Sequence, residues 1–178
     1  MNLPNKLTLL RVVLIPFFVI AMLAPFGIAE QKWIALFIFI VACVTDYFDG
    51  QIARSRNLIT TFGKFMDPLA DKLLVCAALI CLVDLGRIPG WMVIIIISRE
   101  FIISGFRLVA ANQNIVIAAG WLGKIKTCLQ MAAIILLIAD ISQLRTIANV
   151  VLWAAVIMTV ISLVDYLIKN RQVIGKDI

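Results

Sequence analysis

The sequence predicts an all-α integral membrane protein, a bundle of six transmembrane helices with both termini in the cytoplasm. Hydrophobic residues make up 63% of the 178 residues, and the mean hydropathy is +1.09. A soluble domain is about 45–50% apolar, and one helical membrane crossing takes about 20 residues. The chain therefore accommodates six crossings and little else, and we expect a single membrane domain over residues 1–178.

The expected helices follow the apolar runs, and each break between two runs coincides with turn-forming or charged residues. Pro25 and Gly27 end the first run, and the polar stretch SRNLITT ends the second. The connections are short, which favours one compact bundle, and no internal repeat supports an inverted-repeat transporter. The expected spans are 8–26, 32–54, 64–85, 88–111, 119–140 and 145–168.

The basic residues predict the orientation of these spans. Most lie at one set of helix ends, whereas the opposite loops hold only Lys32, Arg87 and Arg145. Because cytoplasmic loops carry the excess of Lys and Arg, both termini and the SRNLITT stretch are expected in the cytoplasm. The net charge of +6 is then explained by lipid headgroups. No basic stripe with interleaved aromatic residues is present, so a nucleic-acid partner is not expected.

Four of the ten acidic residues stand together in the stretch 45–71, between apolar segments. An ionised aspartate in hydrocarbon costs on the order of 3 kcal/mol, so these side chains are expected to face a polar site and to share cations. Asp46 and Asp49 are spaced i, i+3, and Asp67 and Asp71 are spaced i, i+4, so each pair projects from one helix face. The short connection lets the two helices pack antiparallel, with the pairs facing each other.

The ligand chemistry of this cluster narrows the choice of metal. The chain contains no histidine, and carboxylate oxygens are the ligands that Mg²⁺, Mn²⁺ and Ca²⁺ prefer, whereas zinc prefers nitrogen and sulfur.

The small residues Gly50, Ala53 and Gly63 interleave the acids and indicate either room for a substrate or close helix packing. Arg54 follows near the same face, and its guanidinium suits a phosphate.

At this point the stretch resembles the signature of the CDP-alcohol phosphatidyltransferases. Eight positions match at the fixed spacing Asp46-x₂-Asp49-Gly50-x₂-Ala53-Arg54-x₈-Gly63-x₃-Asp67-x₃-Asp71, without a gap. Further similarity lies in the segments 4–11, 67–72, 99–100 and 123–127, so the resemblance covers nearly the whole chain. These segments look like the branch of the family that uses glycerol 3-phosphate as its acceptor.

The resemblance implies an enzyme that transfers a phosphatidyl group from CDP-diacylglycerol to an alcohol and releases CMP. It implies two divalent metal ions, Mg²⁺ or Mn²⁺, one held by Asp46, Asp49 and Asp67, the other touched by Asp46, Asp67 and Asp71, with Asp71 as the base. It also implies a homodimer. With the predicted orientation, we expect an integral protein of the bacterial inner membrane whose active site faces the cytoplasm.

The same resemblance assigns residues to the CDP-linked lipid. Gly50, Ala53 and Gly63 would flank the cytidine, and Arg54 would meet the diphosphate. Asn5 and Thr8 resemble positions that line the same pocket; the alternative is a helix N-cap and a surface hydroxyl.

The basic residues of the second half of the chain predict an anionic acceptor. Arg99 lies within an expected span, where a cation is functional by default, and Arg107, Lys124 and Lys126 complete a candidate phosphate-binding set. Glycerol 3-phosphate offers both a phosphate and a free hydroxyl. For Arg107 and Lys126 the alternative is snorkelling to lipid phosphates, and Glu100 could pair with one of these cations.

Other functions stay open from the residues alone. A family member could use inositol phosphate, serine or phosphatidylglycerol as its acceptor, because the basic residues favour a phosphorylated acceptor without naming it. A divalent-cation transporter would also need intramembrane carboxylates. It would not need Gly50, Ala53 and Arg54 at these spacings, and its acids would lie at mid-depth of the membrane.

Overall fold

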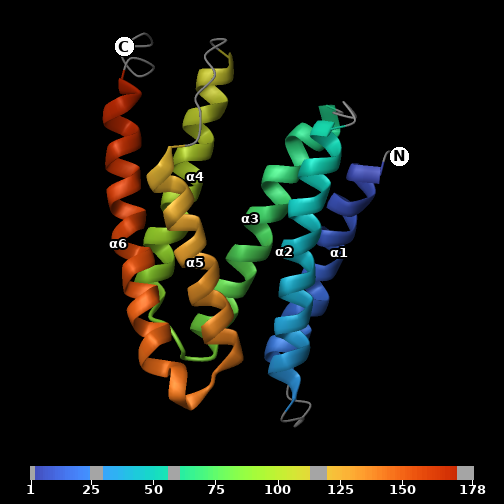
Figure 1. The fold of residues 1–178 in the computed structure, drawn as a ribbon, viewed down its shortest axis with the longest axis vertical. Helices are drawn as coiled ribbons and strands as arrows, with labels where there is room; N and C mark the ends of the chain where they lie inside the picture. Colours follow the sequence, from blue (N-terminus) through green and yellow to red (C-terminus); the bar gives the residue numbers. More distant parts are fainter. Residues whose placement is uncertain (1–2, 25–29, 56–60, 113–119, 172–178) are drawn as a thin grey trace. The chain divides into compact units, whose positions relative to one another are not determined.

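The computed structural model describes residues 3–24, 30–55, 61–112 and 120–171. Within helices, the side chains of residues 3–8, 46–55, 61–68, 71 and 111–112 lie outside the described part. The described chain is almost entirely helical and contains no strand (Figure 1). Its elements are α1 (Leu3–Leu23), α2 (Gln31–Ser55), α3 (Thr61–Asp84), α4 (Gly90–Asn112), α5 (Trp121–Ala139), the 3₁₀ helix η1 (Ser142–Leu144) and α6 (Arg145–Lys169).

The prediction of six α-helices is confirmed within these described ranges. The largest difference is at the start of α1, which begins at Leu3, whereas the first span was predicted from residue 8. The apolar run that predicts a span excludes the polar residues Asn5 and Lys6, but a helix can continue through them. Pro4 is no obstacle, because a proline in the first helical turn removes an N–H that has no intrahelical acceptor.

The chain divides into two compact units, Met1–Arg87 and Ile88–Ile178, and each is described by itself. In the first unit, α1 packs against both α2 and α3, and these two helices contact each other less than each contacts α1. The rings of Phe18 on α1 and Phe39 on α2 are both fully buried, with centroids 5.8 Å apart. The helix that holds the first unit together is therefore α1. The expected single domain over the whole chain stays a prediction.

The end of α3 is a turn that requires a glycine. Gly86 has a φ of +66°, and its N–H donates to the carbonyl of Val83 at 2.9 Å, while the N–H of Arg87 donates to the carbonyl of Leu82 at 2.9 Å. This is the Schellman arrangement, in which a left-handed residue satisfies the last helical carbonyls. Pro89 follows and cannot continue the helix.

In the second unit, α6 packs against both α5 and α4. The buried face of α6 recurs every three or four residues, as a helix packed along one stripe requires. It contains the hydroxyls of Thr159 and Ser162, which donate to the carbonyls of Ala155 at 2.6 Å and Thr159 at 3.0 Å. The members of this face are Ala148, Leu152, Ala155, Val156, Thr159, Ser162 and Tyr166.

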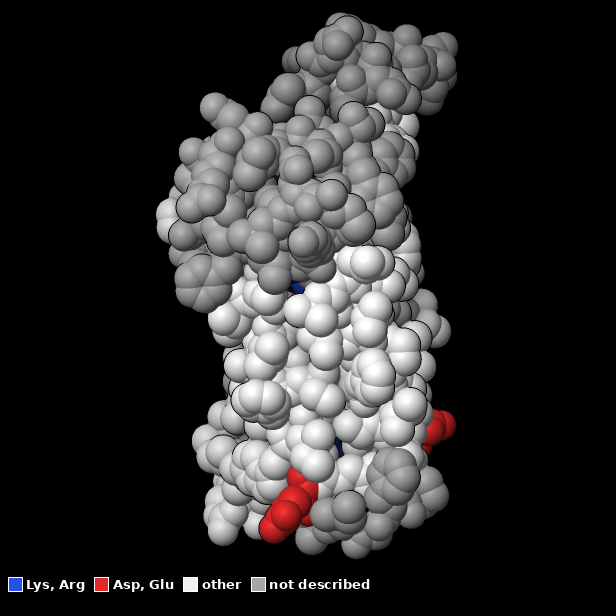
Figure 2. Space-filling view, turned by 90° about the vertical axis from the view of Figure 1, so that its right-hand side faces the viewer, with Lys and Arg blue, Asp and Glu red and all other residues white. Residues whose placement is uncertain are grey.

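The outward faces of the helices are apolar over most of their length. Phe37, Ile94, Trp121, Val150 and Ile168 are 63–77% exposed, and the described middle part of the face in Figure 2 carries almost no charged surface. Exposed apolar area of this extent on every helix is typical of a protein solvated by lipid.

Two helical stretches in the part of the chain with described side chains are long and apolar enough to cross a membrane. They are Trp121–Ala139 and Ser142–Lys169, with mean hydropathies of 1.7 and 2.4. Leu9–Leu23 and Gln31–Thr45 are apolar but shorter. The helix number is thus as predicted, whereas six crossings and the orientation of the termini stay predictions.

Replacing Phe18 by alanine is expected to lower the free energy of unfolding by about 3 kcal/mol, because it leaves a cavity between α1 and α2. Thermal unfolding of the purified protein in detergent measures this loss. Phe17→Ala on the same helix is the matched control, since its ring is 58% exposed. Equal losses in the two variants would show that the Phe18–Phe39 contact does not hold the first unit together.

Candidate active site

The predicted aspartates lie on two consecutive helices of the first unit. Asp46 and Asp49 belong to the second half of α2, and Asp67 and Asp71 belong to the first half of α3. Because both helices are continuous there, each pair has the helical i, i+3 or i, i+4 spacing that puts its members on one face. The two pairs flank the connection 56–60, so they belong to corresponding ends of α2 and α3 (Figure 1).

The side chains of all four aspartates lie outside the described residues, as do those of Gly50, Ala53, Arg54 and Gly63. Among the side chains that are described, no group of three or more His, Cys, Asp or Glu could hold a metal ion. The helix positions of the predicted metal ligands are therefore known, and their coordination stays a prediction.

Asn5 and Thr8 lie in the first two turns of α1, and their side chains are also outside the described residues. The alternative that Asn5 caps this helix is wrong, because α1 begins at Leu3 and an N-cap residue precedes the first helical residue. Asn5 and Thr8 are three residues apart within one helix, and so lie on the same side of it.

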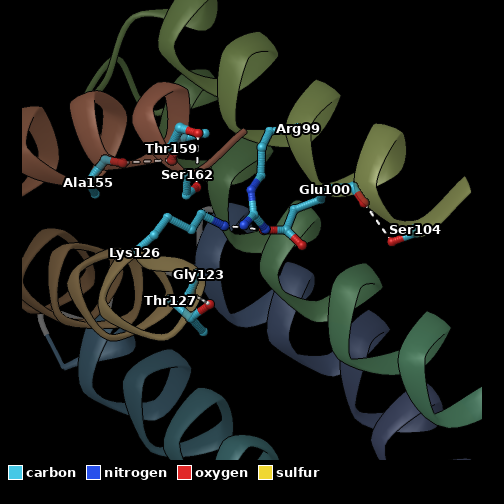
Figure 3. Close-up of polar contacts among 9 residues, drawn as sticks. All are labelled: Arg99, Glu100, Ser104, Gly123, Lys126, Thr127, Ala155, Thr159 and Ser162. Atoms are coloured by element: carbon cyan, nitrogen blue, oxygen red, sulfur yellow. Dashed lines mark hydrogen bonds and ion pairs between the residues drawn. The ribbon is translucent and has the colours of Figure 1, made fainter. Parts of the chain in front are cut away.

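The second unit contains a cluster of three charged residues, Arg99 and Glu100 on α4 and Lys126 on α5, here called the Glu100 cluster (Figure 3). Nη1 of Arg99 lies 3.3 Å from Oε1 of Glu100, and Nζ of Lys126 donates to the same oxygen. Lys126 is 1% exposed and Arg99 is 8% exposed. The expected pairing of Glu100 with one cation is confirmed, and the carboxylate in fact contacts two.

The Glu100 cluster explains how two cations can be buried between apolar helices. An unpaired buried charge costs several kcal/mol, and the carboxylate compensates for one of the two positive charges. Counted over these three side chains alone, one net positive charge remains. A buried site with this charge is suited to an anion that supplies further oxygen acceptors.

Arg99 keeps part of its hydrogen-bonding capacity unused. Its Nε is buried and has no hydrogen-bond partner in the described part of the chain. A buried donor without a partner carries a cost of about 1–3 kcal/mol, which an oxygen of a bound anion would offset. Of the four predicted acceptor-binding residues, Arg99 and Lys126 are therefore brought together at a site with anion-binding chemistry.

The other two predicted cations lie elsewhere on the second unit. Arg107 is exposed and lies over the ring of Tyr166, with its guanidinium carbon 5.7 Å from the ring centroid, and Lys124 is exposed over the ring of Trp121 at 5.3 Å. Lys124 and Lys126 are two residues apart and point to different sides of α5, since Lys124 is exposed and Lys126 is buried. Snorkelling is wrong for Lys126, because its ammonium is buried against Glu100.

Tyr166 on α6 is a residue that the sequence did not single out as part of a site. Its ring packs edge-on against Phe106, with centroids 5.8 Å apart, and its hydroxyl is buried without a partner among the described residues. The available signal was weak: a polar aromatic near the end of an apolar helix is also typical of membrane interfaces.

A family model described as CDP-alcohol phosphatidyltransferase matches residues 1–161. This chain belongs to that family. The CDP-diacylglycerol–glycerol-3-phosphate 3-phosphatidyltransferase of Bacillus subtilis (strain 168) is 48% identical over 96% of this chain and 96% of its own length. Proteins of the same name from Haemophilus influenzae (strain ATCC 51907 / DSM 11121 / KW20 / Rd) and Rickettsia prowazekii (strain Madrid E) are 42% and 38% identical, each over 93% of this chain and over 91% and 93% of their own lengths.

Family membership confirms the resemblance on which the site prediction rests. It favours a phosphatidyltransferase over the alternative of a divalent-cation transporter. Apolar helices and bacterial relatives together indicate that this phosphatidyltransferase is a membrane protein.

Replacing Lys126 by methionine is expected to lower the free energy of unfolding by roughly 2–3 kcal/mol, because it removes one partner of a buried ion pair. The cost is reduced by Arg99, which still contacts Glu100. Thermal unfolding in detergent measures the effect.

Lys169→Met provides the matched control. Lys169 pairs with Asp165 at 2.8 Å, but its side chain is 68% exposed, and an exposed pair contributes about 0–1 kcal/mol. If Lys126→Met were no less stable than Lys169→Met, the buried pairing of Lys126 would not contribute to the stability of the protein.

Proposed function

We propose that this phosphatidyltransferase transfers the phosphatidyl group of CDP-diacylglycerol to a hydroxyl of sn-glycerol 3-phosphate, forming phosphatidylglycerophosphate and releasing CMP. The observation that carries the proposal is the similarity over nearly the full length to relatives whose names state this activity. The unbroken eight-position signature supports the chemistry, and the Glu100 cluster supports an anionic acceptor.

In this proposal the first unit handles the CDP-linked lipid. The guanidinium of Arg54 meets the diphosphate, and Gly50, Ala53 and Gly63 leave room beside the cytidine. Asn5 and Thr8 of α1 belong to the same pocket. Their common side of α1 supports this assignment, since α1 packs against both helices that carry the signature.

Two divalent ions, Mg²⁺ or Mn²⁺, belong to this proposal. The donor set fits them, because four carboxylates on two continuous helices offer oxygen ligands in two same-face pairs. Asp46, Asp49 and Asp67 would hold one ion, and Asp46, Asp67 and Asp71 would touch the other. When bound, such ions offset the negative charge of the diphosphate and of the departing CMP.

Asp71 has a second role in the proposed reaction. A carboxylate oxygen of Asp71 takes the proton of the acceptor hydroxyl, whose oxygen forms a bond to the phosphorus next to the diacylglycerol. The bond from that phosphorus to the CMP oxygen breaks. The chain contains no histidine, so a carboxylate is the natural general base.

The second unit binds the phosphate of the acceptor. Arg99 and Lys126 provide buried positive charge that Glu100 compensates only in part. Arg107 and Lys124, exposed near two aromatic rings, add to the positive potential that attracts an anionic acceptor.

We further propose six membrane crossings with both termini in the cytoplasm of a bacterium, the active site at the cytoplasmic face of the inner membrane, and a homodimer. The distribution of basic residues supports the orientation. The family resemblance supports the dimer.

Asp71→Asn is expected to reduce the turnover number at least about 100-fold, since general-base catalysis contributes factors of this size. The measurement is CMP release by purified protein with CDP-diacylglycerol and Mg²⁺. Parallel reactions contain glycerol 3-phosphate, inositol phosphate, serine, phosphatidylglycerol or no acceptor. Asp84→Asn is the control, because Asp84 is an exposed carboxylate at the other end of α3.

Three outcomes distinguish the proposed reaction from transfer to another acceptor and from the absence of phosphatidyl transfer. CMP release that depends on glycerol 3-phosphate and is lost only in Asp71→Asn supports the proposal. Release with another acceptor keeps the phosphatidyl transfer and overturns the acceptor assignment. No release from folded, metal-loaded protein with any acceptor overturns the proposed function.

The proposed topology predicts that two described positions, one before α6 and one after it, are accessible from opposite sides of the membrane. In a cysteine-free background, a cysteine at Gln143 should react with a membrane-impermeant maleimide applied to intact cells, whereas one at Arg171 should react only after the cells are opened. Gln143 and Arg171 are both exposed, so burial does not explain a difference. Labelling of both positions from outside would contradict the orientation.

A further inference from the structure

Gly123 on α5 leaves a space that one side chain occupies. A Cβ built on Gly123 would lie 3.3 Å from Nη2 of Arg99, and within 4 Å it would meet no other heavy atom of the described chain. A contact of this length is tighter than ordinary van der Waals packing, so the guanidinium would have to move by a few tenths of an ångström. The missing side chain of Gly123 therefore gives room to Arg99.

The guanidinium of Arg99 is not free to move away. Its Nη1 lies 3.3 Å from Oε1 of Glu100, and Lys126 donates to that same oxygen from the facing helix. Any shift of Arg99 away from α5 changes its contact with a carboxylate that a second cation also holds. Figure 3 shows the three side chains pointing toward one another, with Gly123 beside Lys126 on α5.

The orientation fixed in this way leaves Nε of Arg99 buried and without a partner in the described residues. A guanidinium uses neighbouring N–H groups to bind phosphate in a fixed geometry. Hydrogen bonds to a phosphate depend on the direction of the N–H bonds. A small rotation of the guanidinium therefore weakens phosphate binding even though its charge is unchanged.

We propose that Gly123 and Glu100 are positioning residues that set the orientation of the Arg99 guanidinium for the phosphate of the acceptor. This inference rests on the proposed function and extends it, since it assigns the acceptor affinity to two residues that do not touch the acceptor. Glu100 contacts the guanidinium on one side. On the other side, Gly123 has no side chain, which leaves room for the guanidinium.

Close packing of helices is the usual reason for a glycine in a membrane helix, and the geometry argues against it here. A Cβ on Gly123 would meet a side-chain nitrogen and no backbone atom of a neighbouring helix within 4 Å, as far as the described residues extend. Glycine in a helix also costs about 0.5–1 kcal/mol relative to alanine. Gly123→Ala should therefore keep or raise the stability of the protein while it weakens acceptor binding.

The test compares Gly123→Ala with Gly105→Ala. Gly105 lies on α4 of the same unit, and a Cβ there would meet nothing within 4 Å, so both variants gain the same helix propensity. Gly123→Ala is expected to raise the KM for glycerol 3-phosphate about tenfold, which corresponds to the loss of roughly one good interaction. The kcat and the KM for CDP-diacylglycerol should stay within about twofold, because the lost interaction is made equally in the ground and transition states.

A binding readout without turnover separates this inference from the proposed function. Glycerol 3-phosphate, or inorganic phosphate, is added without the lipid donor, and the rise in Tm is measured. Wild type and Gly105→Ala should gain stability from the ligand, and Gly123→Ala should gain clearly less at equal concentration. Glu100→Gln, which keeps the shape and removes the charge, should lose protection in the same way.

Each outcome decides one of the two proposals. If wild type releases no CMP with glycerol 3-phosphate, the proposed function fails, and the phosphate-induced Tm shifts still judge the positioning of Arg99. If Gly123→Ala matches Gly105→Ala in both KM and Tm shift, the inference is overturned while the function stands. If wild type gains no stability from either ligand, the inference is overturned as well. Should Glu100→Gln fail to fold, the two glycine variants alone decide.

Discussion

The second half of this protein depends on how charge is neutralised between apolar helices. Lys126 is almost completely buried, and Arg99 nearly so, and neither position is tolerable in an apolar bundle without a carboxylate nearby. Glu100 contacts both cations through one oxygen. The backbones of α4 and α5 approach each other at few points, whereas each packs on α6. The polar bridge is thus a principal direct connection between α4 and α5 among the described residues.

The same constraint explains why the acids of the first half of the chain are arranged as they are. Four aspartates at helical spacing on either side of one short connection would repel one another unless cations lay between them. In the second unit the chain supplies the compensating charge from its own side chains. In the first, the proposed metal ions supply it. Charge is thus compensated by an internal ion pair where a phosphate is expected to bind, and by the proposed metal ions where a diphosphate is expected to react.

The helices could be predicted from the sequence because lipid-facing segments are continuously apolar and their interruptions are polar. The connections that follow the expected spans 64–85 and 119–140 proved to be true turns, one with Gly86 at a φ of +66° and one with Asp140 at a φ of 43°. The start of α1 was missed, since hydropathy reports where a span begins and not where a helix begins. The position of Asn5 within the helix follows from that difference.

The candidate site was predictable to the extent that residue types and spacing carry the chemistry. Arg99 was singled out because a cation within an apolar helix needs a reason, and Glu100 stands next to it in the sequence. The bridge to Lys126 joins residues 26 positions apart and depends on how two helices face each other, which local spacing does not encode. The space at Gly123 depends on the same packing. Arg107 and Tyr166 meet for a similar non-local reason.

In each unit one helix contacts both of the others, α1 in the first unit and α6 in the second. These two helices differ in when they are synthesised relative to their neighbours. In the first unit the helix that contacts both others, α1, is synthesised first, so α2 and α3 can each dock on an existing surface as they emerge. In the second unit the corresponding helix, α6, is synthesised last. Until α6 is synthesised, α4 and α5 lack the helix on which both of them pack, and the ion bridge through Glu100 is one contact between them. The packing of the second unit is therefore completed only when α6 is present, whereas that of the first unit starts from a helix that is already made.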